Sequence, residues 1–237
     1  MPECDDFDRY ASEYTEVLDV ALSTTGADRD YFAVDRVERI RRREQHDGRT
    51  PSRILDLGCG DGATEVHLER AFPAARVSAV DISAESIRIG AERGLDRCEF
   101  VHYDGDRLPY PDAWFQLVYI AGVLHHVPDD SQRASVLAEV ARVLQPGCRA
   151  YVFEHNPLNP FTRRIVDRCP FDDHARLIRA RELRGLTEAA GLVGVETHYI
   201  HFAPRHRLFS PVHAVESHLR GIPIGAQYFV VAGAPRP

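Results

Sequence analysis

Residues 53–73 read "RILDLGCGDGATEVHLERAFP", in which three glycines fall within five positions directly after an apolar run. Gly58, Gly60 and Ala63 satisfy the pattern G-x-G-x-x-G/A, which in nucleotide-binding proteins marks a tight turn between a strand and a helix. Asp81 ends the next apolar run, where such folds place a carboxylate that binds a ribose. The stretch therefore predicts a cofactor that contains a nucleoside.

Strand-like and helix-like segments alternate around this turn. Strands are expected at 53–57, 76–81, 98–103, 115–121, 148–154, 194–202 and 226–233. Helices are expected at 7–22, 28–43, 62–71, 84–93, 131–144 and 179–190. Such alternation predicts an α/β fold with a mostly parallel sheet and helices on both faces, which binds ligands outside the carboxyl ends of its strands.

Composition limits the class of protein. A chain of 237 residues suits one domain, and its 29 basic against 36 acidic side chains leave a net charge of −7 without a basic block, which disfavours a nucleic-acid partner. No window approaches the ~20 apolar residues of a membrane span, and the acidic start "MPECDDFDRY" lacks the features of a signal peptide. We expect a cytoplasmic protein.

Metal binding is not expected. The five cysteines form no CxxC pair, and His198 and His201 would point to opposite faces of an extended strand, so they would not converge on an ion.

The charges around the turn argue against an anionic cofactor. Asp56 stands two residues before the first glycine and Asp61 lies inside the turn, so both would flank a bound pyrophosphate. The chain also contains no lysine, so it lacks the Tyr-x-x-x-Lys pair of a nicotinamide-dependent reductase. S-adenosylmethionine, which carries an ammonium and a sulfonium, matches the two carboxylates better.

Four ordered motifs carry a resemblance to a known family. "ILDLGCGDG", "VSAVDIS", "VHYDGDRLPYPDAWFQLVYIAGVLHHV" and "EVARVLQPGCRAYVFEHNP" cover residues 53–155 without a break in order. They resemble class I S-adenosylmethionine-dependent methyltransferases, and "EHNP" resembles a bacterial subgroup of them. The resemblance implies a three-layer αβα Rossmann-like fold with a helical lid. It also implies seven strands, of which the last, "AQYFVVAGA", is inserted antiparallel.

The resemblance also implies which residues hold the cofactor. The glycines would lie against its methionyl part, Asp56 would take its ammonium, and Asp81 would accept from both ribose hydroxyls. Asp104 would accept from the adenine amine, although an Asp-Gly pair is also typical of a plain turn. The full expected set is Asp56, Gly58, Gly60, Asp81, Ile82, Asp104, Gly105 and Ala121.

Candidate catalytic residues follow two neighbouring strands. His125 matches the position of a histidine that acts as general base in similar O-methyltransferases, although one histidine of an "LHH" sequence can simply pack. Glu154 and His155 end the next strand and can supply the base instead. Tyr14, His126 and Asn156 are expected to contact the substrate, with a turn held by side-chain hydrogen bonds as the alternative for Asn156.

The remaining segments predict how the single domain is organised. Residues 1–50 are expected to form a helical lid, 51–156 the cofactor-binding core, and 157–237 substrate-side insertions and the final strands. These additions suit an apolar or aromatic small molecule. The sequence thus predicts methyl transfer to a small molecule, with a hydroxyl as one candidate acceptor and a homodimer as one candidate assembly. The alternative is a binding module or a catalyst of other chemistry, such as cyclisation.

Overall fold

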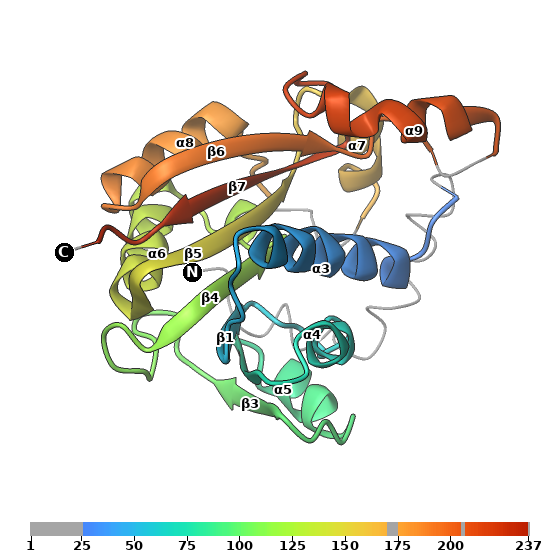
Figure 1. Ribbon diagram of the computed structural model, residues 1–237. Coiled ribbons are helices and arrows are strands. Elements are labelled where there is room, and N and C mark those ends of the chain that lie inside the picture. Colours follow the sequence, from blue (N-terminus) through green and yellow to red (C-terminus); the bar gives the residue numbers. More distant parts are fainter. Residues whose placement is uncertain (1–25, 170–174, 205–206, 237) are drawn as a thin grey trace.

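The computed structural model describes residues 26–169, 175–204 and 207–236. These residues form a sheet between two layers of helices (Figure 1). The strands are β1 Arg53–Leu57, β2 Arg76–Asp81, β3 Cys98–His102, β4 Phe115–Ala121, β5 Leu144–His155, β6 Val193–Ile200 and β7 Gln227–Gly233. The α-helices are α3 Arg29–His46, α4 Glu65–Ala71, α5 Ala84–Ala91, α6 Asp130–Val143, α7 Pro160–Val166, α8 Ala180–Ala189 and α9 Ser210–Leu219.

The sheet has seven strands in the order β3-β2-β1-β4-β5-β7-β6. Every pair is parallel except those made by β7, which runs antiparallel to both β5 and β6. The predicted α/β architecture, with its antiparallel last strand, is confirmed. The strand order reverses between β1 and β4, and this switch point is where open α/β sheets leave a crevice for a ligand.

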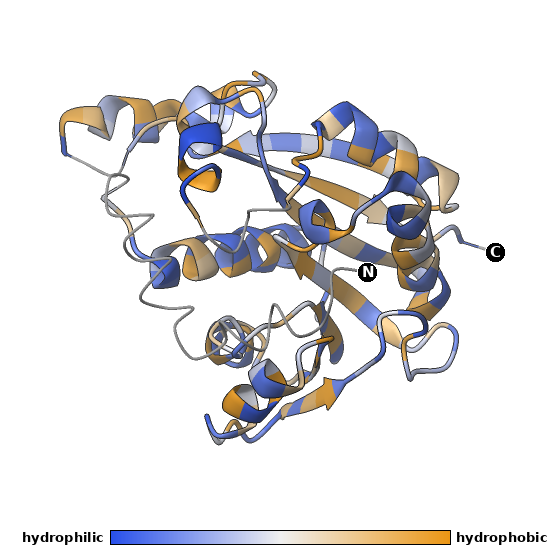
Figure 2. Cartoon of the chain, turned by 180° about the vertical axis from the view of Figure 1, so that it is seen from behind, coloured by the Kyte–Doolittle hydropathy of each residue, from blue (hydrophilic) through white to orange (hydrophobic). Residues whose placement is uncertain are grey.

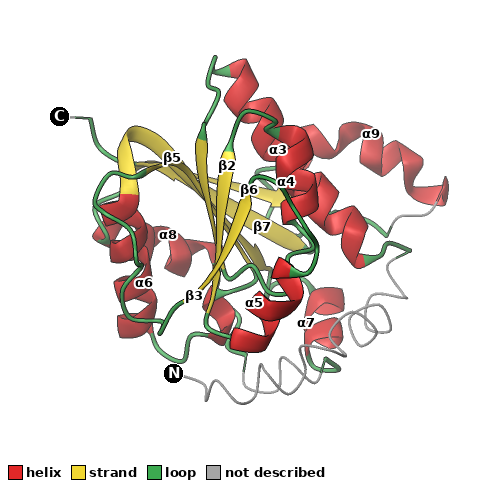
Figure 3. Ribbon diagram, turned by 90° about the horizontal axis from the view of Figure 1, so that it is seen from below, coloured by secondary structure: helices red, strands yellow, loops and turns green. Residues whose placement is uncertain are grey.

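One face of the sheet is covered by α3, α4 and α5 (Figure 3). Helix α3 begins after Asp28, whose side chain accepts a hydrogen bond from the Tyr31 amide at 2.8 Å. Its Val37 and Ile40 are buried in one cluster with Ile54 and further strand residues. Helix α3 is therefore part of the layered core, and only its first turns reach the carboxyl ends of the strands.

The opposite face is covered by α6 and α8 (Figure 3). Leu137 and Val140 of α6 and Leu183 of α8 pack against apolar side chains from β1, β4, β5 and β7. Seen from behind, the strands carry bands of hydrophobic residues between these helices (Figure 2). Both faces are thus sealed, which directs ligands to the edge where the strands end.

Two predicted element starts differ from the structure by more than one residue, and several predicted ends differ by one to three residues. Strand β5 begins at Leu144 rather than 148, because the chain passes straight from α6 into the sheet and bends at Gly147, whose φ is 75°. Helix α4 begins at Glu65 rather than 62, because Gly62 has a φ of 77° and cannot be helical.

Helix α9 lies at the margin of the molecule and buries none of its side chains. Its Glu216 pairs with Arg39 of α3 at 2.7 Å. In the described part of the chain, no helix is both long and apolar enough to cross a membrane.

Candidate cofactor and active site

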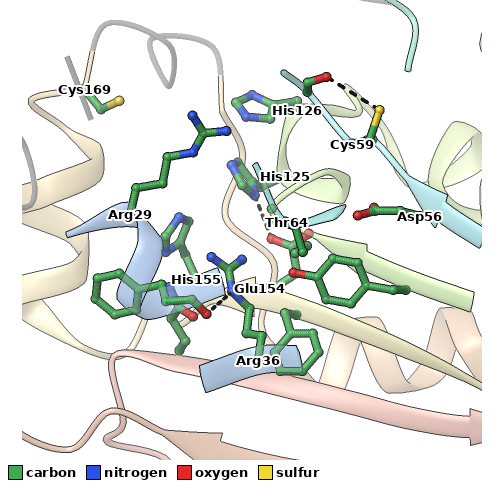
Figure 4. Close-up of a pocket in the computed structure, with 18 residues that line it drawn as sticks. Arg29, Arg36, Asp56, Cys59, Thr64, His125, His126, Glu154, His155 and Cys169 are labelled. Atoms are coloured by element: carbon green, nitrogen blue, oxygen red, sulfur yellow. Dashed lines mark hydrogen bonds and ion pairs between the residues drawn. The ribbon is translucent and has the colours of Figure 1, made fainter. Parts of the chain in front are cut away.

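A pocket of about 150 Å³ opens at the carboxyl ends of β1, β4 and β5, beside the first turns of α3 (Figure 4). Eight of the predicted site residues line it: Asp56, Gly58, Gly60, Ala121, His125, His126, Glu154 and His155. The crevice predicted from the strand order thus gathers residues from three strands and the turn that follows β1.

The glycine turn is shaped for close approach of a ligand. Gly58 has a φ of 81°, and a Cβ on it would stand 2.3 Å from Cγ2 of Val123. Gly60 has a φ of 57°, but a Cβ there would meet no protein atom within 4 Å. Gly58 is therefore required by protein packing, whereas Gly60 leaves its backbone open on the side of the pocket.

Asp56 fits the cation that the sequence assigned to it. Its side chain is buried at 1% exposure, lines the pocket, and has no hydrogen-bond partner on either oxygen within the described residues. Burial, and next the neighbouring carboxyl of Glu65, raise the pKa of Asp56 well above its ordinary value. A buried carboxyl without a partner is costly, so this one is suited to a cationic group of a ligand.

Asp61 differs from its predicted role. The sequence placed its charge against the cofactor, but its carboxylate pairs with Arg29 of α3 and with Arg93, the latter at 2.9 Å. Although burial opposes it, these arginines lower the pKa of Asp61. Because the charge of Asp61 is compensated, only Asp56 supports the electrostatic argument against an anionic cofactor.

Asp81 holds the glycine turn to β2. One carboxylate oxygen accepts from the Gly60 amide at 2.8 Å and the other from the Ser83 amide at 2.9 Å. Ser83 is the N-cap of α5, as its sequence position indicates, and accepts from the Ser86 amide at 3.0 Å. Asp81 thus positions the turn, and its contact with a ribose stays a prediction, as does the contact of Ile82 with adenine.

Asp104 and Gly105 lie in an exposed turn after β3. Oδ1 of Asp104 accepts a hydrogen bond from the Asp106 amide at 3.0 Å. This bond agrees with the alternative prediction that the Asp-Gly pair forms a plain turn. Gly105 adopts a φ of 85°, which this turn requires. The adenine contact of Asp104 remains a prediction.

His125 and Glu154 form a buried pair at the floor of the pocket. Nδ1 of His125 lies 2.7 Å from Oε2 of Glu154, and the other oxygen of Glu154 accepts from the Leu124 amide at 2.8 Å. Both residues are 2% exposed. Burial raises the pKa of Glu154, but the interactions with His125, His155 and the Leu124 amide outweigh it and lower the pKa overall. The ionised form of Glu154 is therefore favoured, and its Oε2 can accept a hydrogen bond from Nδ1–H of His125.

Two further histidines surround this pair. The ring centroids of His126 and His155 lie 4.1 Å and 5.3 Å from that of His125. All three imidazoles line the pocket (Figure 4). The sequence expected His125 and the Glu154/His155 pair as separate candidates, and the structure joins them into one cluster.

Asn156 points elsewhere. Its amide nitrogen donates to the carbonyls of Pro223 and Gly225 at 3.2 and 2.7 Å, and its Oδ1 accepts from the Leu158 amide at 3.0 Å. Because these bonds use its amide group and the residue does not line the pocket, the turn alternative describes Asn156, and we withdraw it as a substrate contact. Tyr14 lies outside the described residues.

Several residues that line the pocket are absent from the predicted set of site residues. Arg29, Phe32 and Arg36 reach the pocket from one face of α3, and Tyr119 reaches it from β4. The spacing of the three α3 residues, three and four positions apart, is a signal that they share a helix face. Tyr119 and Gln116 are the two residues with a polar side-chain group in the otherwise apolar strand "FQLVYIA".

No metal centre accompanies this cluster. Within residues 26–169, 175–204 and 207–236, no three His, Cys, Asp or Glu side chains are grouped so that they could hold an ion. His198 stacks on Phe229 with ring centroids 4.9 Å apart, and His201 packs edge-on against Phe32 at 5.0 Å.

Comparison with known proteins agrees with this geometry. A family model described as "Methyltransferase domain" matches residues 54–147. The 27-O-demethylrifamycin SV methyltransferase of Amycolatopsis mediterranei (strain S699) is 37% identical over 106 residues, which are 43% of this chain and 38% of that protein. The ubiquinone/menaquinone biosynthesis C-methyltransferase UbiE of Pseudomonas fluorescens (strain SBW25) is 32% identical over 130 residues, or 52% and 50% of the two chains. The chain thus spans half or less of the length of these relatives.

Solved structures share the fold. A methyltransferase of Thermotoga maritima, described as a possible histamine N-methyltransferase, superposes with a TM-score of 0.70 at 18% identity and covers 97% of this chain and 98% of its own. The [4+2]-cyclase SpnF superposes with a TM-score of 0.55 at 21% identity, over 78% and 76% of the two chains. Residues 54–147 thus match a methyltransferase domain, the fold is that of the superposed methyltransferase, and both indicate S-adenosylmethionine as the cofactor.

Proposed function

We propose that this protein transfers a methyl group from S-adenosylmethionine to a hydroxyl of a small molecule, with His125 as general base and Glu154 as the residue that orients it. The observation that carries this proposal is the 2.7 Å contact between Nδ1 of His125 and the buried carboxylate of Glu154, at the floor of the cofactor pocket.

The pair has the chemistry that a hydroxyl acceptor needs. Because the ionised Glu154 accepts from Nδ1, it fixes the tautomer of His125 that carries its lone pair on Nε2. A neutral imidazole in that form can remove a proton from a hydroxyl as the oxygen attacks. The bound cofactor supplies an electrophilic methyl group on its sulfonium. The protein's task is then to align the hydroxyl in line with that methyl and to exclude water.

The lining of the pocket bounds the acceptor. Phe32, Tyr119 and Phe153 offer aromatic surface, and Arg36 adds a cationic group. An apolar or aromatic molecule fits this lining better than a cation does. The name of the rifamycin relative states an oxygen acceptor, and that of UbiE states a carbon acceptor. The preference for oxygen proposed for this protein therefore rests on the His125–Glu154 pair.

The first experiment identifies an acceptor. A panel of phenols and hydroxylated macrocycles is incubated with protein and S-adenosylmethionine, and mass spectrometry follows both the gain of one methyl and the formation of S-adenosylhomocysteine. Each compound is paired with its analogue that lacks the hydroxyl, and methylation of the hydroxylated partner only is the expected result. A changed skeleton without added mass would instead indicate a reaction of the kind named for SpnF.

The second experiment tests the roles of the pair. With the acceptor found, His125→Ala and Glu154→Gln should each lower kcat by roughly 10²- to 10⁴-fold while the affinity for the cofactor stays unchanged. His46→Ala is the matched control, because His46 is exposed at the end of α3 and does not line the pocket. If both pocket variants keep kcat within about tenfold of the parent, the reaction does not use a general base at this site.

A further inference from the structure

Buried polar atoms without partners gather behind the pocket. Nine buried side-chain atoms lack a hydrogen-bond partner in the described residues, and five of them belong to Asp56, Glu65 and Tyr119. These three side chains are at most 1% exposed. Native proteins rarely leave such groups unpaired, so a cluster of them indicates a place where a ligand or its water completes the bonding.

Of these three residues, Glu65 is the one that belongs to no sequence motif and does not line the pocket. It opens α4 directly after Thr64, which lines the pocket, and it lies beside Asp56 at the end of β1. The positive end of the α4 dipole favours an acidic residue here. The helix dipole alone does not explain why this carboxyl is fully buried, because a solvent-exposed carboxylate at the same position would also stabilise the helix.

The two carboxyls cannot both be ionised cheaply without a cation. Burial, the largest effect, raises the pKa of Glu65 to about 7, and the pKa of Asp56 is raised by burial and by Glu65. The titratable and charged groups that face the pair are Asp61 from the turn, Asp81 from β2, Arg36 from α3, Arg93 after α5, Tyr119 from β4, and the thiols of Cys59 and Cys98. Asp61 already engages Arg93.

We propose that Glu65 is a positioning residue of the cofactor site, which with Asp56 holds one proton before the cofactor binds and releases it to solvent when the cofactor's α-ammonium arrives. This inference rests on the use of S-adenosylmethionine. A cation at about 4 Å in a partly buried site should lower the pKa of the pair by about 3. The ammonium therefore replaces the proton as the positive charge that the two buried carboxyls require.

Calorimetry on the unmodified protein tests this directly. S-adenosylhomocysteine carries the same ammonium, and its binding is measured at pH 6.5 and pH 8.5 in buffers of different ionisation enthalpy, which gives the number of protons released. We expect most of one proton per ligand at pH 6.5 and almost none at pH 8.5. Methylthioadenosine, which keeps the nucleoside and the thioether but has no ammonium, should bind without releasing a proton.

A variant assigns the proton to Glu65. Glu65→Gln keeps the shape of the side chain but removes one of the two carboxyls, so the charge of Glu65 no longer raises the pKa of Asp56 and the proton release at pH 6.5 should fall below that of the parent. In the parent, affinity for S-adenosylhomocysteine should weaken by up to about tenfold per pH unit below pH 7, and in the variant this dependence should flatten. Glu69→Gln, one turn further along α4 and bonded to the Arg97 amide, is the matched control and should behave as the parent.

The outcomes separate this inference from the proposed function. If the parent binds S-adenosylhomocysteine without releasing a proton at pH 6.5, the cofactor assignment stands and the role of Glu65 is wrong. The same holds if Glu65→Gln keeps the pH dependence of the parent. If the parent does not bind S-adenosylhomocysteine at all, the proposed function itself is wrong.

Discussion

Asp81 shows how one residue can serve both the protein and the ligand. Its two oxygens already bind the Gly60 and Ser83 amides, and a carboxylate oxygen has a second lone pair for a further donor. The residue predicted to hold the ribose is therefore also the one that fixes the turn beneath the cofactor. Loss of the Asp81 charge should therefore weaken both the contact with the ribose and the hold on the glycine turn.

For Asp81→Asn we expect cofactor affinity to weaken by about 2 to 4 kcal/mol, because an amide cannot accept from both backbone donors. Asp104→Asn is the comparison, since that carboxylate is exposed and caps a turn. Its effect on stability should stay near 1 kcal/mol. Titration calorimetry with S-adenosylhomocysteine measures the affinity and thermal unfolding measures the stability, and equal affinities for parent and Asp81→Asn would show that the ribose is held elsewhere.

Two glycines of the turn should respond differently to an added methyl group. Gly60→Ala meets no protein atom, so it should cost only about 1 to 2 kcal/mol of stability for its left-handed φ, yet block the cofactor. Gly58→Ala would clash with Val123 at 2.3 Å and should lower the thermal midpoint by more. Thermal unfolding together with cofactor binding distinguishes the two, and tight binding by Gly60→Ala would place the ligand off this turn.

Individual site residues were predictable where a local motif carries them. Asp56 lies in the last two residues of β1, and Gly58, Gly60 and His125 follow strand ends, so their neighbours in sequence are also their neighbours in the pocket. The partners of Asp61 were not predictable, because Arg29 and Arg93 each stand 32 positions away. Arg29 reaches the turn only because α3 packs on the sheet.

Strand ends were predicted more accurately than strand beginnings. The bounds of β1, β2 and β4 match the expected ranges because short apolar runs end at charged or glycine residues. In β5 the Pro146-Gly147 pair indicates a turn, but the structure accommodates it as a bend inside the strand. A Pro-Gly pair is a local signal, and the neighbouring strand decides the outcome.

The loop from Pro223 to Gly225 is held by the side chains of Asn156 and Asn159, which follow β5. Asn156→Ala would leave the carbonyls of Pro223 and Gly225 without their donor, and we expect the free energy of unfolding to fall by about 2 to 3 kcal/mol. Cofactor affinity should change little, since Asn156 does not line the pocket. Urea unfolding and calorimetry measure the two effects, and weaker binding at unchanged stability would restore Asn156 to the site.

Acid sensitivity of the whole molecule should depend on His201. Burial lowers its pKa to about 3, although Oδ2 of Asp35 lies 3.5 Å from Nε2. Between pH 3 and about pH 6.5 the unfolded chain therefore binds a proton that the folded protein does not, so this residue makes stability rise with pH.

His201→Asn removes this titration, and asparagine tolerates the φ of 61° at that position. Urea unfolding of the cofactor-free protein at pH 5 and pH 7 gives the stability lost on acidification. In the variant that loss should be smaller by about 2 kcal/mol than in the parent. Equal losses would mean that His201 is protonated in the folded protein.

The alternation of strands and helices predicts the α/β class but not the full order of the sheet. Each parallel crossover from β1 to β5 follows from local patterns and right-handed connections. Nothing local places β7 between β5 and β6, because that choice depends on pairings such as Tyr151 with Val231, 80 positions apart. The resemblance to a family supplied this part of the prediction.

The central place of β7 has a consequence for biosynthesis. A ribosome delivers residues 227–233 after every other strand, yet β7 is the only link between β5 and β6 in the sheet. Until that segment emerges, the outer side of β5 and the whole of β6 present unpaired backbone, which attracts other nascent chains. These edges must therefore stay shielded from other chains until residues 227–233 have been synthesised.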